Sequence, residues 1–346
     1  MSVAKITSDL AKLGGQMLEL AHNFENSDYA PVFEKAMQEN PWFTSDSIRL
    51  SFQSIGRSLT AQKITHWLSN YPIEKPKKIK TIGLILAGNL PLVGLHDILC
   101  VLISGNRARV KLSSKDQHLY QIVSELLIKI NPWYQNQITF TDQTIKEVDA
   151  IIATGSDNSA RYFESYFEKY PHIIRKNRNA VALLTGNETL HDLEHLATDI
   201  FSYFGLGCRN VSFLLIPKGF EINRLFESFA KFSKVIQHNK YANNYDYQKA
   251  LLLLNQESFH DNGMVLLKED PSLSSPIAVL HYQYYSDIEQ VTHFVGLNKT
   301  KIQCIVSKTK WPFATYELGE AQHPELWDYA DNVNTLDFLL NLNSKL

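Results

Sequence analysis

The sequence predicts an α/β protein whose mostly parallel sheets carry helices on both faces. Apolar runs typical of buried strands alternate with helical periodicity from residue 79 onward. The 346-residue chain is also long enough for two lobes with separate cores. Residues 4 to about 72 are predicted to be helical, because apolar side chains recur there at helical spacing.

A proline- and lysine-rich stretch, Tyr71-Pro-Ile-Glu-Lys-Pro-Lys-Lys78, is expected to connect the helices to the first sheet. After it, strands are expected at 79–86, 108–112 and 148–153, with helices at 91–103 and 117–130. Pro91 suits the first turn of its helix. Further strands are expected at 180–184, 211–216, 263–267, 277–282 and 301–306, with helices at 190–204, 222–235 and 244–257. The tail from Trp311 is expected to be irregular and then helical.

Composition excludes several classes of function. The hydrophobic fraction of 44% and charged fraction of 20% are those of a globular protein, and the net charge of −2 attracts neither nucleic acid nor membrane. The N-terminus lacks a signal-peptide core, and no apolar run is long enough to span a bilayer. Three cysteines make no disulfide framework, so a cytoplasmic location is expected. No histidine–cysteine spacing predicts a metal site.

Cys208 is the strongest candidate for a catalytic group. It lies in Tyr203-Phe-Gly-Leu-Gly-Cys-Arg-Asn-Val-Ser212, where glycines allow a substrate to approach and Arg209 favours the thiolate. Cys100 and Cys304 lie in apolar runs, where a thiol is an inert core group. The alternative for Cys208 is a free cysteine in a βα-type turn.

Three loops that follow predicted strands are candidate ligand sites. Asn89, after Gly88, either directs its amide at a developing oxyanion or caps the next helix. Gly155 and Ser156 open a helix whose N–H groups suit a phosphate, although many helix starts look alike. Lys111 either holds a nucleotide or is solvated. No G-x-G-x-x-G or P-loop motif occurs at these loops.

Taken in order, these loops resemble the aldehyde dehydrogenase superfamily. The matching stretches are Leu86-Ala-Gly-Asn-Leu-Pro-Leu92 for "P-W-N-F-P-L", Ser104-Gly-Asn-Arg-Ala-Arg-Val-Lys-Leu-Ser-Ser114 for "A-G-N-x-V-V-x-K-P-S-E", Thr154-Gly-Ser156 for "F-T-G-S" and Gly205-Leu-Gly-Cys208 for "G-Q-x-C". Within it, the chain is similar to the LuxC-like acyl-CoA reductases over roughly residues 40 to 340. The supporting stretches are 87–94, 153–163, 170–178, 203–212 and Gly319-Glu-Ala-Gln322.

The resemblance implies two Rossmann-like lobes, with an N-terminal helical segment at 1–72, an NADP-binding lobe at 73–178 and a catalytic lobe at 179–309. Residues 310–346 would return to the cofactor lobe or to a partner subunit. It also implies reduction of a long-chain acyl-CoA or other acyl thioester to the aldehyde by NADPH. Cys208 would be the nucleophile and Asn89 an oxyanion donor. The implied cofactor-binding residues are Lys111, Ser114, Gly155 and Ser156.

Three departures from the superfamily pattern qualify this implication. Val181-Ala-Leu-Leu-Thr-Gly-Asn187 lacks the water-activating glutamate of "E-L-G-G", which favours transfer to a thiol, and Glu188 lies too late to replace it. Ser114 replaces the ribose-binding glutamate, which favours NADPH over NADH. Leu273-Ser-Ser-Pro-Ile-Ala-Val279 lacks the glutamate of "E-x-F-G-P-V", so the grip on the nicotinamide ribose is in doubt.

Two polar stretches each allow two interpretations. His238 to Tyr241 either lines an acyl or CoA entrance or is a solvated helix connector, and Arg175 to Arg178 either meets CoA phosphates or is an exposed loop. Rival functions are a CoA-acylating aldehyde dehydrogenase on short substrates and a non-redox acyl-transfer subunit. Expected partners are copies of the chain itself and an acyl-protein ligase or acyl carrier.

Overall fold

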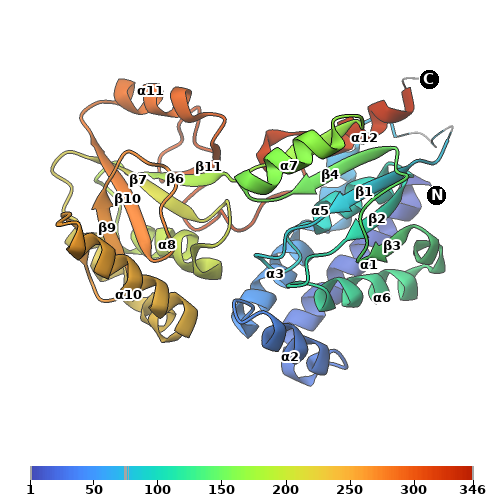
Figure 1. The fold of residues 1–346 in the computed structure, drawn as a ribbon, viewed down its shortest axis with the longest axis horizontal. Helices are drawn as coiled ribbons and strands as arrows, with labels where there is room; N and C mark the ends of the chain where they lie inside the picture. Colours follow the sequence, from blue (N-terminus) through green and yellow to red (C-terminus); the bar gives the residue numbers. More distant parts are fainter. Residues whose placement is uncertain (1, 74–75, 77, 345–346) are drawn as a thin grey trace. The chain divides into compact units, whose positions relative to one another are not determined.

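The computed structural model describes residues 2–73, 76 and 78–344, and the chain divides into two compact units (Figure 1). The first unit is Met1–Asn177 with His323–Leu346, and the second is Arg178–Gln322. In the predicted connector, Glu74, Lys75 and Lys77 lie outside the described residues.

The first unit is built on a five-stranded sheet in which every neighbouring pair is parallel. Its strand order is β3-β2-β1-β4-β5, with β1 in the centre. The strands are β1 (Thr81–Ile85), β2 (Arg107–Lys111), β3 (Ile138–Thr141), β4 (Ala150–Thr154) and β5 (His172–Arg175). The helices between them are α5 (Leu95–Ile103), α6 (His118–Ile130) and α7 (Asp157–Phe167).

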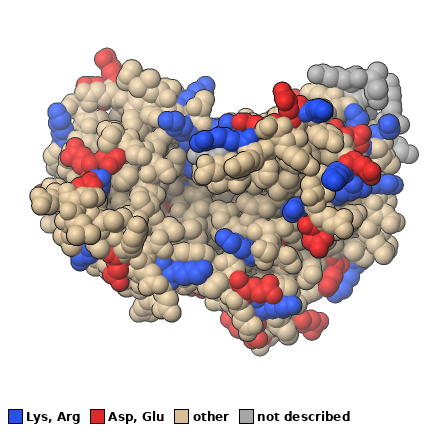
Figure 2. All heavy atoms as spheres, in the orientation of Figure 1, with Lys and Arg blue, Asp and Glu red and all other residues tan. Residues whose placement is uncertain are grey.

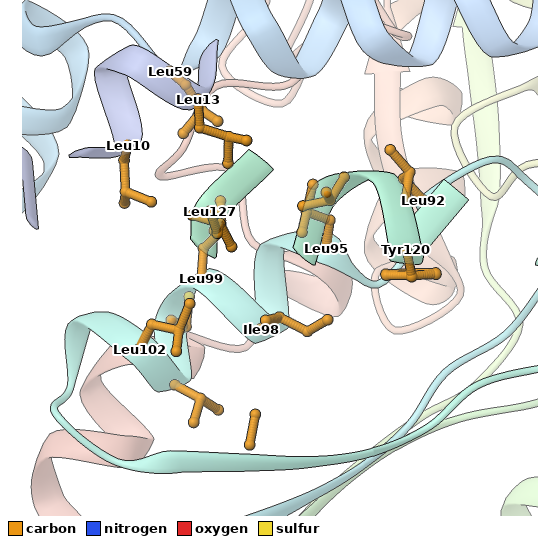
Figure 3. Close-up of a cluster of buried hydrophobic side chains, with 14 of the residues drawn as sticks. Leu10, Leu13, Leu59, Leu92, Leu95, Ile98, Leu99, Leu102, Tyr120 and Leu127 are labelled. Carbon is orange, nitrogen blue, oxygen red and sulfur yellow. The ribbon is translucent and has the colours of Figure 1, made fainter. Parts of the chain in front are cut away.

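Four N-terminal helices complete the core of this unit. They are α1 (Val3–His22), α2 (Ala30–Glu39), α3 (Ser45–Ser58) and α4 (Ala61–Leu68). Figure 3 shows Leu10 and Leu13 of α1 in one buried cluster with Ile98 and Leu99 of α5. Burying each such side chain contributes about 1.5–3 kcal/mol, so the helices are part of the fold. The C-terminal helix α12 (Thr335–Ser344) packs on α5.

The second unit holds a six-stranded sheet of order β11-β6-β7-β10-β9-β8, parallel except for the short edge strand β8. The strands are β6 (Asn179–Leu183), β7 (Val211–Pro217), β8 (His260–Asp261), β9 (Leu266–Glu269), β10 (Val279–Tyr285) and β11 (Ile302–Val306). The helices are α8 (Leu190–Phe201), α9 (Asn223–Phe229), α10 (Asn239–Leu254) and α11 (Ile288–Asn298). The predicted α/β fold, with parallel-type sheets and N-terminal helices, is confirmed.

Several predicted boundaries are wrong. The helix expected from Pro91 begins at Leu95, because Leu92 adopts a left-handed φ of 57° that interrupts helical geometry. Strands β3 and β5 were not expected, since each is only four residues long. The helix expected at 222–235 is α9 followed by the 3-10 segment Ala230–Gln237.

Three further observations concern the surface charge, the helices and the possible metal ligands of the described residues. Figure 2 shows acidic and basic side chains interspersed on the visible face. Within the described part of the chain, no helix is both long and apolar enough to cross a membrane. The same residues include no group of three side chains that could hold a metal ion.

Candidate functional site

Cys208 lies in a tight turn between α8 and the amino end of β7. The turn starts with three consecutive residues of left-handed backbone, Tyr203, Phe204 and Gly205, at φ of 51°, 59° and 77°. The thiol is half-buried, whereas Cys100 and Cys304 are buried, as expected for core cysteines. The turn runs from helix to strand, so it is not the βα-type turn of the alternative interpretation, and the role of the free Cys208 stays a prediction.

Asn210 fastens this turn from below. Its side chain is 2% exposed, and its Nδ2 donates to the carbonyl oxygens of Ser202 (2.7 Å) and Asp199 (3.0 Å). Its Oδ1 accepts from the Gly207 N–H at 2.8 Å. One buried amide therefore holds both sides of the Cys208 turn, with its donor and acceptor groups all satisfied.

The Arg209 guanidinium lies over the ring of Tyr316, with Cζ 5.2 Å from the ring centroid. Burial lowers the pKa of Arg209, but Tyr316 and the thiols of Cys304 and Cys208 outweigh it and hold the pKa above its usual value. Arg209 thus remains charged beside the candidate nucleophile, and a neighbouring cation favours a thiolate.

Asp199, at the end of α8, fixes the Gly319–Gln322 stretch. Its carboxylate accepts from the N–H groups of Gly319 (2.6 Å) and Ala321 (3.0 Å). Burial raises the pKa of Asp199 to about 7, against the lowering effect of those two hydrogen bonds. The stretch that matched the family pattern near the C-terminus is therefore anchored to the helix that leads to Cys208.

Two rings from the 238–241 stretch pack on Phe204 of the Cys208 turn. The His238 ring centroid lies 4.3 Å from that of Phe204, and the Tyr241 centroid lies 6.2 Å from it. Tyr241 is buried, whereas Asn239 and Lys240 are exposed. His238 and Tyr241 therefore place their rings beside the turn, whereas Asn239 and Lys240, at the start of α10, face solvent.

The other five predicted site residues lie at the carboxyl edge of the first sheet. Asn89 follows β1, Lys111 is the last residue of β2 and Ser114 follows it, and Gly155 and Ser156 follow β4. Because these three strands are adjacent and parallel, their loops open on one edge, where α/β sheets bind ligands.

The Asn89 loop (residues 86–94) is held by side chains from other elements. Ser51 Oγ donates to the Pro91 carbonyl (2.8 Å), Asp116 Oδ2 accepts from the Leu92 N–H (2.7 Å), and Tyr120 Oη accepts from the Gly94 N–H (2.9 Å). The N-cap of α5 is Gly94, so the alternative that Asn89 caps this helix is wrong. The Asn89 side chain is exposed on the loop.

The Ser114 loop (residues 112–116) lies against the Asn89 loop. A Cβ added at Gly88 would come within 2.5 Å of Ser113 Oγ, so only glycine allows this approach. Ser114 and Lys115 are exposed, and Lys111 is partly buried. Asp116 is the loop's acid, and burial raises its pKa to about 8.

Ser156 caps α7, with its Oγ accepting from the Ser159 N–H at 3.3 Å. A Cβ at Gly155 would come within 2.7 Å of Ser159 Cβ, so glycine is required for the tight start of this helix. The eleven-residue α7, whose N-cap Ser156 and second residue Asn158 are exposed, offers the positive end of a helix at the same sheet edge.

In the run from Arg175 to Arg178, both interpretations are wrong for Arg175, whereas Lys176 and Asn177 lie in an exposed loop after β5. The Arg175 side chain is 4% exposed and pairs with Asp97 through Nη2–Oδ1 (2.6 Å) and Nε–Oδ2 (3.2 Å). It also donates to the Ala330 carbonyl (2.6 Å) and to Thr335 Oγ1 (2.7 Å). Arg175 is therefore a structural cation that binds the C-terminal segment to the first unit.

The missing "E-L-G-G" glutamate gives no support for transfer to a thiol. Leu183 pairs with Leu215, four residues along β7 from Val211, so this end of β6 lies about 13 Å along the sheet from the Cys208 end. Glu188 accepts from the backbone N–H groups of Thr185 (2.7 Å) and Gly186 (2.9 Å), which makes it a turn-holding group. The stretch 181–187 carries no information about a base beside Cys208.

Sequence reasoning missed the supporting residues of both regions. Asn210 was visible two positions after Cys208, as an asparagine in a glycine-rich turn. Asp199 gave no local signal, because the N–H groups that its carboxylate binds lie 120 and 122 residues away.

Comparisons with known proteins bear on both units. Residues 66–310 match the sequence model of a family described as acyl-CoA reductase (LuxC). A long-chain acyl-protein thioester reductase of Aliivibrio fischeri is 23% identical over 250 residues, covering 63% of this chain and 51% of that protein. One of Photorhabdus laumondii is 22% identical over 253 residues, with the same coverage. The chain spans about half the length of these curated relatives.

Among solved structures, aldehyde dehydrogenase 21 of Physcomitrella patens, in complex with succinate, superposes with a TM-score of 0.70 at 12% identity. The match covers 99% of this chain and 84% of that one. An indole-3-acetaldehyde dehydrogenase of P. syringae, in complex with NAD+, gives 0.67 at 12% identity, covering 90% and 73%. The predicted aldehyde-dehydrogenase-like fold is confirmed.

Proposed function

The chain belongs to the LuxC acyl-CoA reductase family, and we propose that it reduces a long-chain acyl thioester to the aldehyde through an acyl-enzyme on Cys208. The half-buried thiol in a turn fixed by Asn210 and flanked by the charged Arg209 is the observation that carries this proposal. Two relatives named long-chain acyl-protein thioester reductases support the substrate class.

The Cys208 thiolate would attack the acyl carbonyl carbon, and the bond from that carbon to the leaving thiol would break. The displaced thiolate takes up a proton, and the acyl group remains on Cys208. The Cys208 backbone N–H would stabilise the oxyanion, an effect worth about 3 kcal/mol per donor, and Asn89 is proposed as a second donor from the family resemblance alone. After reduction of the acyl carbon, the carbon–sulfur bond to Cys208 would break and release the aldehyde.

The carboxyl edge of the first sheet fits a nicotinamide dinucleotide with a 2′-phosphate. In the loop after β2, Ser114 and Lys115 are exposed, Lys111 is the last residue of the strand, and the raised pKa of Asp116 keeps the buried acid of this loop neutral at pH 7. Gly155 and Ser156 would hold a phosphate at the start of α7. When bound, NADPH supplies the hydride. The first unit would then be the cofactor lobe and the second the catalytic lobe.

The test is incubation of the purified protein with tetradecanoyl-CoA and NADPH, beside Cys208→Ala. Absorbance at the NADPH band and aldehyde formation are followed, with intact mass for the acyl-enzyme. We expect turnover and an acyl adduct in the wild type, and neither in the variant. Adduct without NADPH consumption would indicate a non-redox acyl-transfer subunit. Activity only on acetaldehyde with CoA and NAD would replace the proposal by an acylating dehydrogenase.

Acyl donor and cofactor are compared in the same assay. Because the two relatives are named for acyl-protein thioesters, an acyl-carrier or acyl-ligase thioester is tested beside tetradecanoyl-CoA. We expect kcat/KM to be higher with NADPH than with NADH. A clear NADH preference would overturn the role given to Ser114.

A further inference from the structure

Asn40, at the end of α2, reaches two loops that are distant from it in sequence. Its side-chain Nδ2 donates to the carbonyl oxygens of Gly88 and Lys115, both at 3.3 Å. Gly88 lies in the Asn89 loop and Lys115 in the Ser114 loop. One buried amide, 3% exposed, thus joins the proposed oxyanion loop to the proposed cofactor loop.

Asn40 is itself rigidly placed. Its N–H donates to the Ala36 carbonyl (3.0 Å), its carbonyl accepts from the Phe43 N–H (2.8 Å), and its Oδ1 accepts from the Trp42 N–H (3.2 Å). The polar groups of Asn40 therefore all have partners. The buried Asn40 side chain cannot rotate without leaving a donor or acceptor unpaired, so it fixes the positions of the backbone groups that it binds.

The two loops are also in direct contact, so a shift in one is felt by the other. The close approach of Gly88 to Ser113 and the Asp116–Leu92 hydrogen bond both cross between them. Asn40 differs from these ties because it comes from a third element, α2, which belongs to the N-terminal helical core. It sets the position of both loops relative to the body of the unit.

We propose that Asn40 is a positioning residue that holds the Asn89 loop and the Ser114 loop in one arrangement, so that a single side chain sets both oxyanion stabilisation and cofactor affinity. This inference rests on the proposed function for its catalytic part. Its structural part, the tie between two loops, stands on the hydrogen bonds alone.

The test uses Asn40→Asp, which is nearly isosteric and keeps the acceptor for Trp42 but loses both donated bonds, with Asn40→Ala beside it. Ser51→Ala, which loses a bond to the Asn89 loop only, and Ser58→Ala, whose hydroxyl donates to Ile55 within α3, are the matched controls. Three quantities are measured: amide hydrogen exchange of the two loops, the Kd for NADP+, and the rate of Cys208 acylation by tetradecanoyl-CoA without cofactor.

Asn40→Asp is expected to speed exchange in both loops, to raise the Kd for NADP+ about fivefold and to slow acylation by a similar factor. Ser51→Ala should slow acylation more than it raises the Kd, since its bond is to the Asn89 loop only, and Ser58→Ala should change neither. Unchanged exchange in either loop, or a normal Kd and acylation rate in Asn40→Asp, would overturn the proposal. A wild type that neither binds NADP+ nor becomes acylated would instead reject the proposed function, while the exchange data still judge the tie.

Discussion

Replacing Asn210 by alanine should slow the reaction of Cys208 more than the loss of overall stability alone would explain. The substitution removes three short hydrogen bonds, to Ser202 O (2.7 Å), Gly207 N (2.8 Å) and Asp199 O (3.0 Å). At about 1 kcal/mol for each bond, the loss is about 3 kcal/mol. That corresponds to a fall in Tm of roughly 5 to 10 °C.

The effect on the reaction should be larger than the effect on stability. Tyr203 and Phe204 hold left-handed backbone that costs about 1 kcal/mol or more each, and Asn210, bonded to Ser202 and Gly207 on either side of them, opposes their relaxation. Once they relax, Cys208 moves, and a shift on the order of 1 Å slows a positioned reaction about 100-fold. We therefore expect acylation of Cys208 by tetradecanoyl-CoA to fall by about two orders of magnitude, well below the melting temperature.

Asn106→Ala is the matched control for this experiment. Asn106 is buried in the first unit, where it accepts from the Lys80 N–H (3.0 Å) and donates to Ser104 Oγ (2.9 Å). Its loss should cost about 2 kcal/mol without touching the Cys208 turn. Equal acylation rates in Asn210→Ala and Asn106→Ala, at equal fractions folded, would refute the reasoning.

Three other outcomes are expected. Burial raises the pKa of Asp116 to about 8, so between about pH 4 and about pH 8 the folded protein keeps a proton that the unfolded chain has released, and stability falls as the pH rises through this range. Asp116→Asn should flatten that fall in urea unfolding measured between about pH 5 and 8, and an unchanged slope would contradict it. Arg175→Ala should lower the free energy of unfolding by about 3–5 kcal/mol in the same assay, whereas the exposed Lys176→Ala should lower it by at most about 1 kcal/mol. Equal losses would show that the buried Arg175–Asp97 pair does not stabilise the fold. Ser114→Glu should lower the ratio of kcat/KM for NADPH over NADH, since a carboxylate repels a 2′-phosphate; an unchanged ratio would exclude contact at Ser114.

The fold could be predicted from the sequence because its determinants are local. Alternating apolar runs and helical periodicity mark most strands and helices without reference to the rest of the chain. Errors occurred where a local signal was weak or overridden. Pro91 suits a helix start, but the left-handed Leu92, whose N–H is bound by Asp116 Oδ2, delays the helix to Leu95.

The candidate site was only partly predictable, for a related reason. Motif residues such as Cys208 and Asn89 are recognisable by their neighbours in sequence. The residues that hold them are recognisable only by contacts made in space. Arg175 illustrates the difference: its pattern fitted an exposed basic loop, and only its partner Asp97, 78 residues earlier, explains its burial.

The Arg175 cluster also sets an order of events during synthesis. Arg175 meets Thr335 across 160 residues, and the whole second unit is encoded between them. A ribosome adding roughly 5–20 residues per second needs about 8 to 32 s to make that interval. During this interval, the Arg175 guanidinium can pair with Asp97, but the Ala330 carbonyl and the Thr335 hydroxyl have not yet been made. The first unit therefore begins to fold before the second unit is synthesised, but it is completed only after the second unit has been made.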